Sequence, residues 1–216
     1  MLARSIFADV QATCGAGGVC YVRSDRPTPF AGTLTVTAVT LATGATRVVY
    51  SAPALALPAG PGAALWFNVD AGINGNTTVL VADVYEAPAQ VPAWRAAATY
   101  ASPLAALGGG AAPALVSSNL VLLAPPAALA APAAAVAFTV ADAVNADGTV
   151  DITLTTDAPA LFVTLTALAQ GRFSDNAFLL LPGAPRVVTY IPFVAPTDYA
   201  TLATTLRVEH AASYAQ

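Results

Sequence analysis

The chain has 216 residues, enough for one large or two small domains, and it is 56% hydrophobic but only 9% charged. All eight basic residues are arginines and the formal net charge is −4, so no basic stripe exists to neutralise phosphates, which argues against nucleic-acid binding. The low charge indicates that some apolar surface is covered by another domain.

The high hydropathy of the chain raises the question of a membrane span. Mean hydropathy is +0.66, and the uncharged stretch between Arg95 and Asp142 is long enough to cross a bilayer, which takes about 20 residues. Helix-breaking residues interrupt that stretch at Pro103, Pro113, Pro125, Pro126, Pro132 and Gly108–Gly110. A helix cannot run through so many breakers, so we expect no membrane span. We also expect no signal peptide in this chain, because Asp9 and Gln11 interrupt the apolar run after Arg4.

Two short strands are expected first, over Ile6–Ala12 and Val19–Ser24, on either side of a glycine-rich tip. Cys14 and Cys20 flank this tip. They either form a disulfide that staples a hairpin or remain free thiols in an intracellular protein, and the sequence leaves both open. A metal site is not expected, because one histidine and no further cysteine cannot complete four ligands.

Alternating apolar and polar residues predict the next strands. Gly32–Leu41 alternates with period two and turns at Thr43–Gly44, and Thr46–Ser51 returns as its partner. Ala63–Asp70 and Thr77–Tyr85 are expected to form a hairpin, because the intervening segment contains Asn74–Gly75, a strong hairpin signal. Asn76 begins an Asn-Thr-Thr sequon on this turn, which would be glycosylated only if the protein enters the secretory pathway.

A change of composition divides the chain. Residues 87–114 are rich in alanine and proline and are expected to form an irregular surface insertion that contains Trp94 and Arg95. Ser117–Leu123 then resumes strand character, and Pro125–Pro132 has the composition of a linker. We therefore expect a first domain over 1–128, with the insertion at about 87–114, and a second domain over 131–216.

The second domain is expected to be an antiparallel β-sandwich, because it contains short strand-like runs at regular spacing with turn residues between them. The runs are Val136–Asp142, Thr149–Thr155, Leu161–Ala167, Ala177–Leu181, Arg186–Phe193 and Leu202–His210. Thr197–Thr204 could instead make one helical turn.

Two groups of polar residues suggest chemistry that their spacing does not support. Asn145–Gly148 lies between aspartates like a calcium loop, but the register places Ala143 and Leu154 where carboxylates are required, so we expect a β-turn. His210 follows Glu209 on a predicted strand, where neighbouring side chains point to opposite faces. Neither a catalytic triad nor a cofactor site is expected.

One polar stretch interrupts the apolar second domain. Arg172, Phe173, Ser174, Asp175 and Asn176 precede the buried run Phe178–Leu181. Aspartate and asparagine fix tight turns through side-chain to backbone hydrogen bonds. We expect a structural corner, or a contact to a neighbouring domain, in which Arg172 pairs with Asp175, and not a sugar-binding site.

The same stretch carries a family resemblance. The residues that carry it are Phe162–Val163, Leu165, Gly171–Asn176, Phe178–Leu180, Pro182–Gly183, Val187, Phe193, Pro196–Thr197, Leu202, Leu206–Val208 and Tyr214. In this order they resemble the C-terminal immunoglobulin-like domain of β-mannosidases, which are multidomain glycoside hydrolases related to β-galactosidase and β-glucuronidase. Ser118–Pro125 resembles the segment that joins the two C-terminal sandwich domains of that family. The resemblance implies an all-β fold of two tandem immunoglobulin-like antiparallel β-sandwiches.

The resemblance does not extend to catalysis. Retaining glycosidases need two carboxylates about 5 Å apart, and β-mannosidases resemble their relatives in placing two glutamates on a (β/α)₈ barrel. This chain has only Glu86 and Glu209, in different predicted domains, and no room for a barrel of about 250 residues. We therefore expect no catalytic, cofactor or metal residues and no activity from this chain alone. It would be a non-catalytic tail that supports a catalytic barrel.

The expected partners are the catalytic and other domains of a parent glycosidase, so that any glycan contact is indirect. The compartment is left open; it would be lysosomal or secreted if the parent resembles eukaryotic β-mannosidases. The alternative is a stand-alone adhesion or carbohydrate-binding β-sandwich. Such a module is expected to display a row of exposed aromatic residues, and none is visible from the positions of Trp66, beside Phe67, and Trp94.

Overall fold

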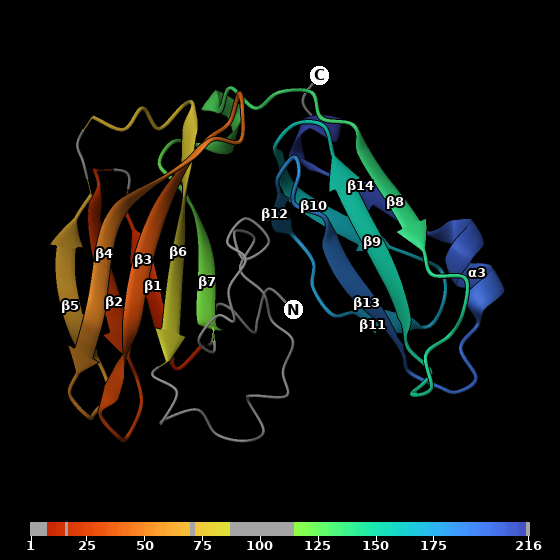
Figure 1. Cartoon of the computed structure of the whole chain (residues 1–216), viewed down its shortest axis with the longest axis horizontal. Coiled ribbons are helices and arrows are strands. Elements are labelled where there is room, and N and C mark those ends of the chain that lie inside the picture. The colour runs from red at the N-terminus through yellow and green to blue at the C-terminus, as the bar shows by residue number, and fades with distance from the viewer. Residues whose placement is uncertain (1–7, 16, 70–71, 87–114, 215–216) are drawn as a thin grey trace. The chain divides into compact units, whose positions relative to one another are not determined.

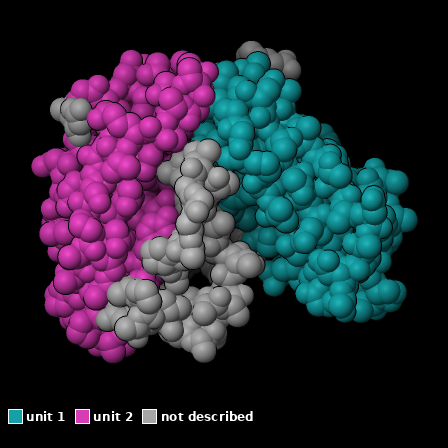
Figure 2. All heavy atoms as spheres, viewed as in Figure 1, with its two compact units in different colours: residues 1–2, 131–216 teal, residues 3–130 magenta. Residues whose placement is uncertain are grey.

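The computed structural model describes residues 8–15, 17–69, 72–86 and 115–214. The chain divides into two compact units, coloured magenta and teal in Figure 2. We call residues 3–130 the N-terminal unit and the part from residue 131 onward the C-terminal unit. The predicted insertion at 87–114, with Trp94 and Arg95, lies outside the described residues, as does Arg4.

The N-terminal unit is a sandwich of two antiparallel sheets (Figure 1). Its strands are β1 (Val10–Cys14), β2 (Val19–Ser24), β3 (Phe30–Thr40), β4 (Thr46–Leu57), β5 (Ala63–Asn68), β6 (Thr78–Glu86) and β7 (Leu115–Leu122). One sheet has the order β1-β2-β5 and the other β4-β3-β6-β7. The 3₁₀ helix η3 (Pro126–Ala128) follows β7.

Alternation along the strands builds the core of this unit. On β3, Leu34 and Val36 are fully buried, while Thr33 and Thr35 between them are partly exposed. Val22 of β2 and Val84 of β6 belong to the same apolar cluster. Side chains of a strand point to alternate faces, so one face of each sheet supplies this core and the other remains for contacts or solvent.

Two strand predictions for this unit are corrected. The strand predicted over Thr46–Ser51 continues to Leu57 as β4. Pro53 does not end it, because β4 is the outer strand of its sheet, where a missing N–H donor is tolerated. The predicted hairpin of β5 with β6 is wrong, since β5 pairs with β2 and β6 pairs with β3 and β7. Asn74 still forms a turn, and its carbonyl accepts the Thr77 N–H at 3.1 Å.

The C-terminal unit is a second antiparallel sandwich (Figure 1). Its strands are β8 (Val136–Val140), β9 (Val150–Thr156), β10 (Ala160–Thr166), β11 (Gly171–Phe173), β12 (Phe178–Leu180), β13 (Arg186–Pro192) and β14 (Arg207–Glu209). The sheets have the orders β11-β13-β9-β8 and β12-β10-β14. The helix α3 (Tyr199–Thr205) precedes β14, and the 3₁₀ helix η4 (Ala211–Ser213) follows it.

The core of the C-terminal unit follows the predicted alternation most clearly on β9. Val150, Ile152 and Leu154 are fully buried, whereas the residues between them carry polar side chains. Val188 and Tyr190 of β13 join the same cluster. The phenol of Tyr190 is removed from solvent, and this burial, together with the Asp198 carboxylate, raises its pKa.

The strand predicted over Leu202–His210 is wrong in its first half, where α3 forms instead. Asp198 caps the helix by accepting the Thr201 N–H at 3.0 Å. Hydrogen bonds from Thr201 also lower the pKa of the Asp198 carboxyl. Leu202 in the helix and Leu206 at its C-cap are both buried, so tertiary packing outweighs the weak helix propensity of the threonines.

The predicted fold class is confirmed: the described chain is an all-β arrangement of antiparallel, immunoglobulin-like sandwiches. In the described ranges, no helix combines the length and the hydropathy that a membrane crossing requires.

Candidate functional site

The polar stretch Arg172–Asn176 forms a corner that leads from β11 into β12. Ser174 extends the pairing of β11 with β13, since its N–H donates to the Thr189 carbonyl at 2.7 Å and its Oγ accepts the Thr189 N–H at 2.8 Å. Phe173 turns inward and packs edge-on against Tyr190, with ring centroids 5.6 Å apart. The end of β11 is therefore fixed before the chain turns.

Asn176 ties the corner to β10 through its side-chain amide. Its Oδ1 accepts the Leu165 N–H at 2.7 Å, and its Nδ2 donates to the Leu165 carbonyl at 3.0 Å. The oxygen and the nitrogen of the amide thus satisfy both backbone groups of Leu165, a residue of β10 that is only 1% exposed. Such a contact replaces the backbone pairing that a continuous strand would supply.

Ala177, the next residue, has a left-handed backbone with a φ of 59°. This conformation is uncommon for a residue with a Cβ and is held here by its contacts. The Ala177 N–H donates to the Val163 carbonyl at 2.8 Å, so the turn is bonded to β10 a second time. The corner thus connects the end of β11 to backbone groups of β10 and β13, which indicates a structural role.

The predicted pair of Arg172 with Asp175 is wrong. Asp175 instead pairs with Arg186 at the start of β13, and these two side chains are 19% and 13% exposed. Arg172 lies within β11 next to the inward Phe173, so alternation directs it to the exposed face. The Arg186 guanidinium also lies 4.2 Å above the centre of the Phe178 ring, a cation–π contact.

Asp175→Ala is expected to destabilise the C-terminal unit by about 1–3 kcal/mol, because it leaves Arg186 partly buried without its carboxylate. The Asp175 Oδ1 also accepts the Asn176 N–H at 2.8 Å, and that bond is lost too. Thermal or urea unfolding measures the change. Arg172→Ala is the matched control and should cost less than about 0.5 kcal/mol. An equal loss in both variants would contradict the assigned pairing.

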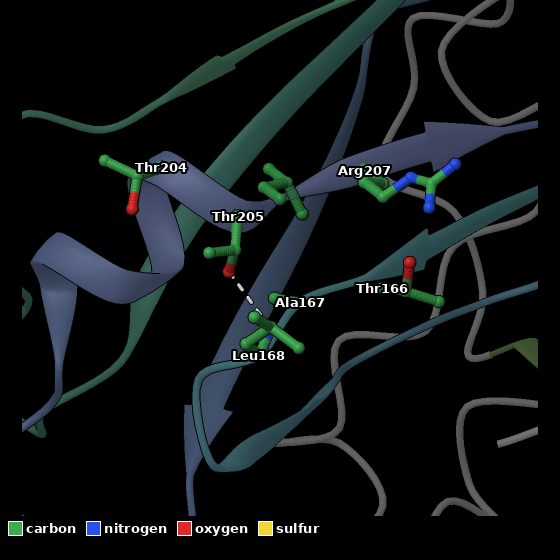
Figure 3. A pocket seen from close by; sticks show the side chains of 7 residues that line it. Thr166, Ala167, Leu168, Thr204, Thr205 and Arg207 are labelled. Carbon is green, nitrogen blue, oxygen red and sulfur yellow. Dashed lines mark hydrogen bonds between the residues drawn. The ribbon is translucent and has the colours of Figure 1, made fainter.

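An open depression of about 460 Å³ lies beside the helix α3 (Figure 3). It is lined by Thr166, Ala167, Leu168, Thr204, Thr205, Leu206 and Arg207. Thr205 Oγ1 accepts the Leu168 N–H at 3.0 Å, which joins its two walls. The titratable residue in this lining is Arg207, and its guanidinium lies 3.1 Å from Glu209. Hydroxyls, methyl groups and one paired guanidinium do not supply an acid and a nucleophile.

The two glutamates occupy different units and have structural partners. Glu86 is 1% exposed and forms an ion pair with Arg26, which also lies 3.8 Å from Asp9. The Arg26 guanidinium lies 5.1 Å from the centre of the Phe30 ring. Glu209 pairs with Arg207 at the surface. A glycosidase needs two cooperating carboxylates, whereas each of these glutamates is paired with an arginine among the described residues.

The residues that suggested a metal site form a turn. The Asn145 carbonyl accepts the Gly148 N–H at 2.9 Å, which closes a β-turn as predicted. Hydrogen bonds from the side chain and backbone of Thr149 lower the pKa of Asp147. In the described part of the chain, no three histidine, cysteine or acidic residues gather where they could hold a metal ion.

The structure also describes the two predicted cysteines and the asparagine of the sequon. Cys14 and Cys20 face each other across the β1–β2 hairpin and are joined by a disulfide. Asn76 is exposed on the turn before β6, and its carbonyl accepts the Ala130 N–H at 2.7 Å. Its side chain is thus accessible, and glycosylation there remains a proposal.

An exposed aromatic pair was not predicted. Trp66 on β5 is 66% exposed, and its ring centroid lies 5.1 Å from that of Tyr21 on β2. The two residues are opposite each other in the sheet register. Pairing of β5 with β2 brings them together, so the sequence alone showed a lone tryptophan beside Phe67. A partial signal was present in the sequence, since Tyr21 lies between the buried residues Cys20 and Val22 and Trp66 precedes the buried Phe67.

Comparison with known proteins matches residues 132–214 to the family model Ig_mannosidase, an Ig-fold domain. A search of curated proteins found no match. Among solved structures, the chain is similar to a β-D-mannosidase from Dictyoglomus thermophilum, with 16% identity and a TM-score of 0.61, over 95% of this chain and 22% of that one. It is also similar to the exo-chitosanase CsxA of Amycolatopsis orientalis, with 16% identity and a TM-score of 0.57, over 96% of this chain and 26% of that one.

At this identity the solved structures show the fold alone, and the chain spans about a fifth to a quarter of their length. The match over 132–214 covers the residues that carried the resemblance, including the corner. The resemblance to the C-terminal immunoglobulin-like domain of β-mannosidases is therefore confirmed for residues 132–214, which match the Ig-fold domain of the Ig_mannosidase model.

Proposed function

We propose that this chain is the non-catalytic C-terminal tandem sandwich portion of a β-mannosidase-like glycoside hydrolase, and that it supports a catalytic barrel carried outside residues 1–216. The observation that carries the proposal is the Ig_mannosidase match over 132–214. The likeness to the mannosidase structure adds support, because it extends over 95% of this chain and includes both units.

The chemistry of the described residues agrees with a supporting role. Glu86 and Glu209 are each held by an arginine, and the corner residues bond to backbone groups of neighbouring strands. Rigid sandwiches of this kind can present a fixed surface to another domain. The partners that we propose are the catalytic and other domains of this parent glycosidase, and the support for them is the same match.

The size of the native protein tests this proposal. An antibody raised against residues 131–216 is used to detect the protein in extracts of its source. We expect a species several times larger than 21.6 kDa, the mass of this chain, in keeping with the 22% and 26% shares of the matched structures. Peptide sequencing of that species should reveal a barrel segment with two glutamates. A native species of 21.6 kDa alone would favour a stand-alone sandwich and contradict the proposal.

A further inference from the structure

The outer face of the β1-β2-β5 sheet carries an aromatic pair that the core does not use. Cys20, Val22 and Phe67 point inward from β2 and β5 and are buried. Tyr21 and Trp66 lie between them on the opposite face, with rings tilted by 47° and centroids 5.1 Å apart. Trp66 is 66% exposed and adjoins the Tyr21 ring, and an apolar patch of this kind on an exposed sheet face is a candidate ligand-binding site.

Two neutral hydrogen-bonding side chains lie beside the pair on the same face. Thr13 of β1 is directly opposite Tyr21, and Asn68 of β5 is two residues from Trp66 on the same face. Adjacent strands are about 4.8 Å apart, so the row Thr13–Tyr21–Trp66 spans about 10 Å across the sheet. This combination offers ring faces in the middle and donors and acceptors at the sides.

The charge of this face favours a neutral ligand. Among the residues of β1, β2 and β5, Arg23 is the charged side chain, and it lies 3.3 Å from the Asp25 carboxylate. A face whose charges pair with each other offers nothing to a phosphate or an acidic peptide. It suits a ligand with C–H groups that stack on the electron-rich faces of aromatic rings and hydroxyls that bond to amides and alcohols.

We propose that the Tyr21–Trp66 pair is a surface binding site for a neutral, extended pyranose polysaccharide. The flat C–H face of one sugar ring lies on the Trp66 indole, and the next sugar along the chain reaches Tyr21. Thr13 and Asn68 bond to the hydroxyls of these sugars. The site would hold a polysaccharide substrate near a hydrolase that carries these sandwiches, but the binding itself depends on this chain alone.

Affinity gel electrophoresis of the whole chain in gels with and without soluble galactomannan tests the site, and tryptophan fluorescence with mannohexaose gives the affinity. We expect galactomannan to retard the chain, and Trp66→Ala to weaken binding about tenfold or more. Tyr21→Ala should weaken it less. Phe138→Ala removes another exposed aromatic, 41% exposed on β8, and is the matched control that should bind as the unchanged chain does.

Circular dichroism and the melting temperature of each variant confirm that it is folded, as expected for a change at an exposed position. Absence of retardation of the unchanged chain would overturn the proposal, as would equal retardation of the Trp66→Ala variant. Sedimentation tests the alternative that a second copy of the chain covers this face. If the unchanged chain were a dimer and Trp66→Ala a monomer, a second copy would cover the face and the proposal would be overturned. None of these outcomes depends on a catalytic barrel.

Discussion

Gly171→Ala is expected to destabilise the C-terminal unit by about 3 kcal/mol or more, at the upper end of the costs of overpacking. A Cβ at position 171 would lie 2.3 Å from Cζ and 2.4 Å from Oη of Tyr190. The Tyr190 ring is 1% exposed and packs against Phe173, so it cannot rotate into solvent. The strand β11 must therefore move away from β13, which strains the pairing at Gly171, Arg172 and Phe173.

Urea unfolding of the chain measures this loss, and two variants make it specific. Gly17→Ala is the matched control, because a Cβ there meets nothing within 4 Å. It should change the free energy of unfolding by less than about 1 kcal/mol. Tyr190→Leu shortens the clashing side chain, so Gly171→Ala should cost much less when added to Tyr190→Leu than when made alone. Equal costs in both backgrounds would show that the ring contact is not the cause.

Asn176→Ala is expected to cost about 2–4 kcal/mol, because it removes both partners of the Leu165 backbone at once. The lost bonds are those of 2.7 Å to the Leu165 N–H and 3.0 Å to its carbonyl. Leu165 itself is only 1% exposed, so water cannot easily replace the side-chain amide of Asn176 as its hydrogen-bonding partner. The same substitution also loosens the turn that precedes the buried β12.

The matched control is Asn145→Ala in the same unit. Asn145 uses Nδ2 to donate to Thr149 Oγ1 at 3.0 Å in an exposed turn, where water can take over the bond. We expect a loss of less than about 1 kcal/mol there. Chemical denaturation with a probe for the C-terminal unit compares the two variants. If Asn176→Ala were no more damaging than Asn145→Ala, the corner would not be the structural element described above.

The parts of the fold that sequence predicts best are those set by local alternation. β9 is an example, since Val150, Ile152 and Leu154 are buried at every second position as the pattern requires. The strand β4 and the helix α3 were predicted less well, because their extent depends on the place of β4 at a sheet edge and on the burial of Leu202 and Leu206. These effects come from tertiary structure, and the sequence of a short segment carries little information about them.

The candidate site shows the same division. The corner at Arg172–Asn176 was predicted from turn chemistry, but the partner of Asp175 was not, because Arg186 arrives from another strand. The Tyr21–Trp66 pair was missed for the same reason, since only the pairing of β2 with β5 makes it visible. The sequence also left the state of Cys14 and Cys20 open, because spacing alone does not decide between a disulfide and free thiols.

The most direct test of the central claim, that these sandwiches support catalysis without performing it, is the turnover of an aryl β-D-mannoside by the purified chain. We expect no rate above that of buffer at any pH between about 4 and 8, the range in which carboxylate catalysis operates. The variant Glu209→Gln is measured alongside as a check on contaminating enzymes. Turnover by the unchanged chain that Glu209→Gln abolishes would contradict the account and place catalysis within these residues.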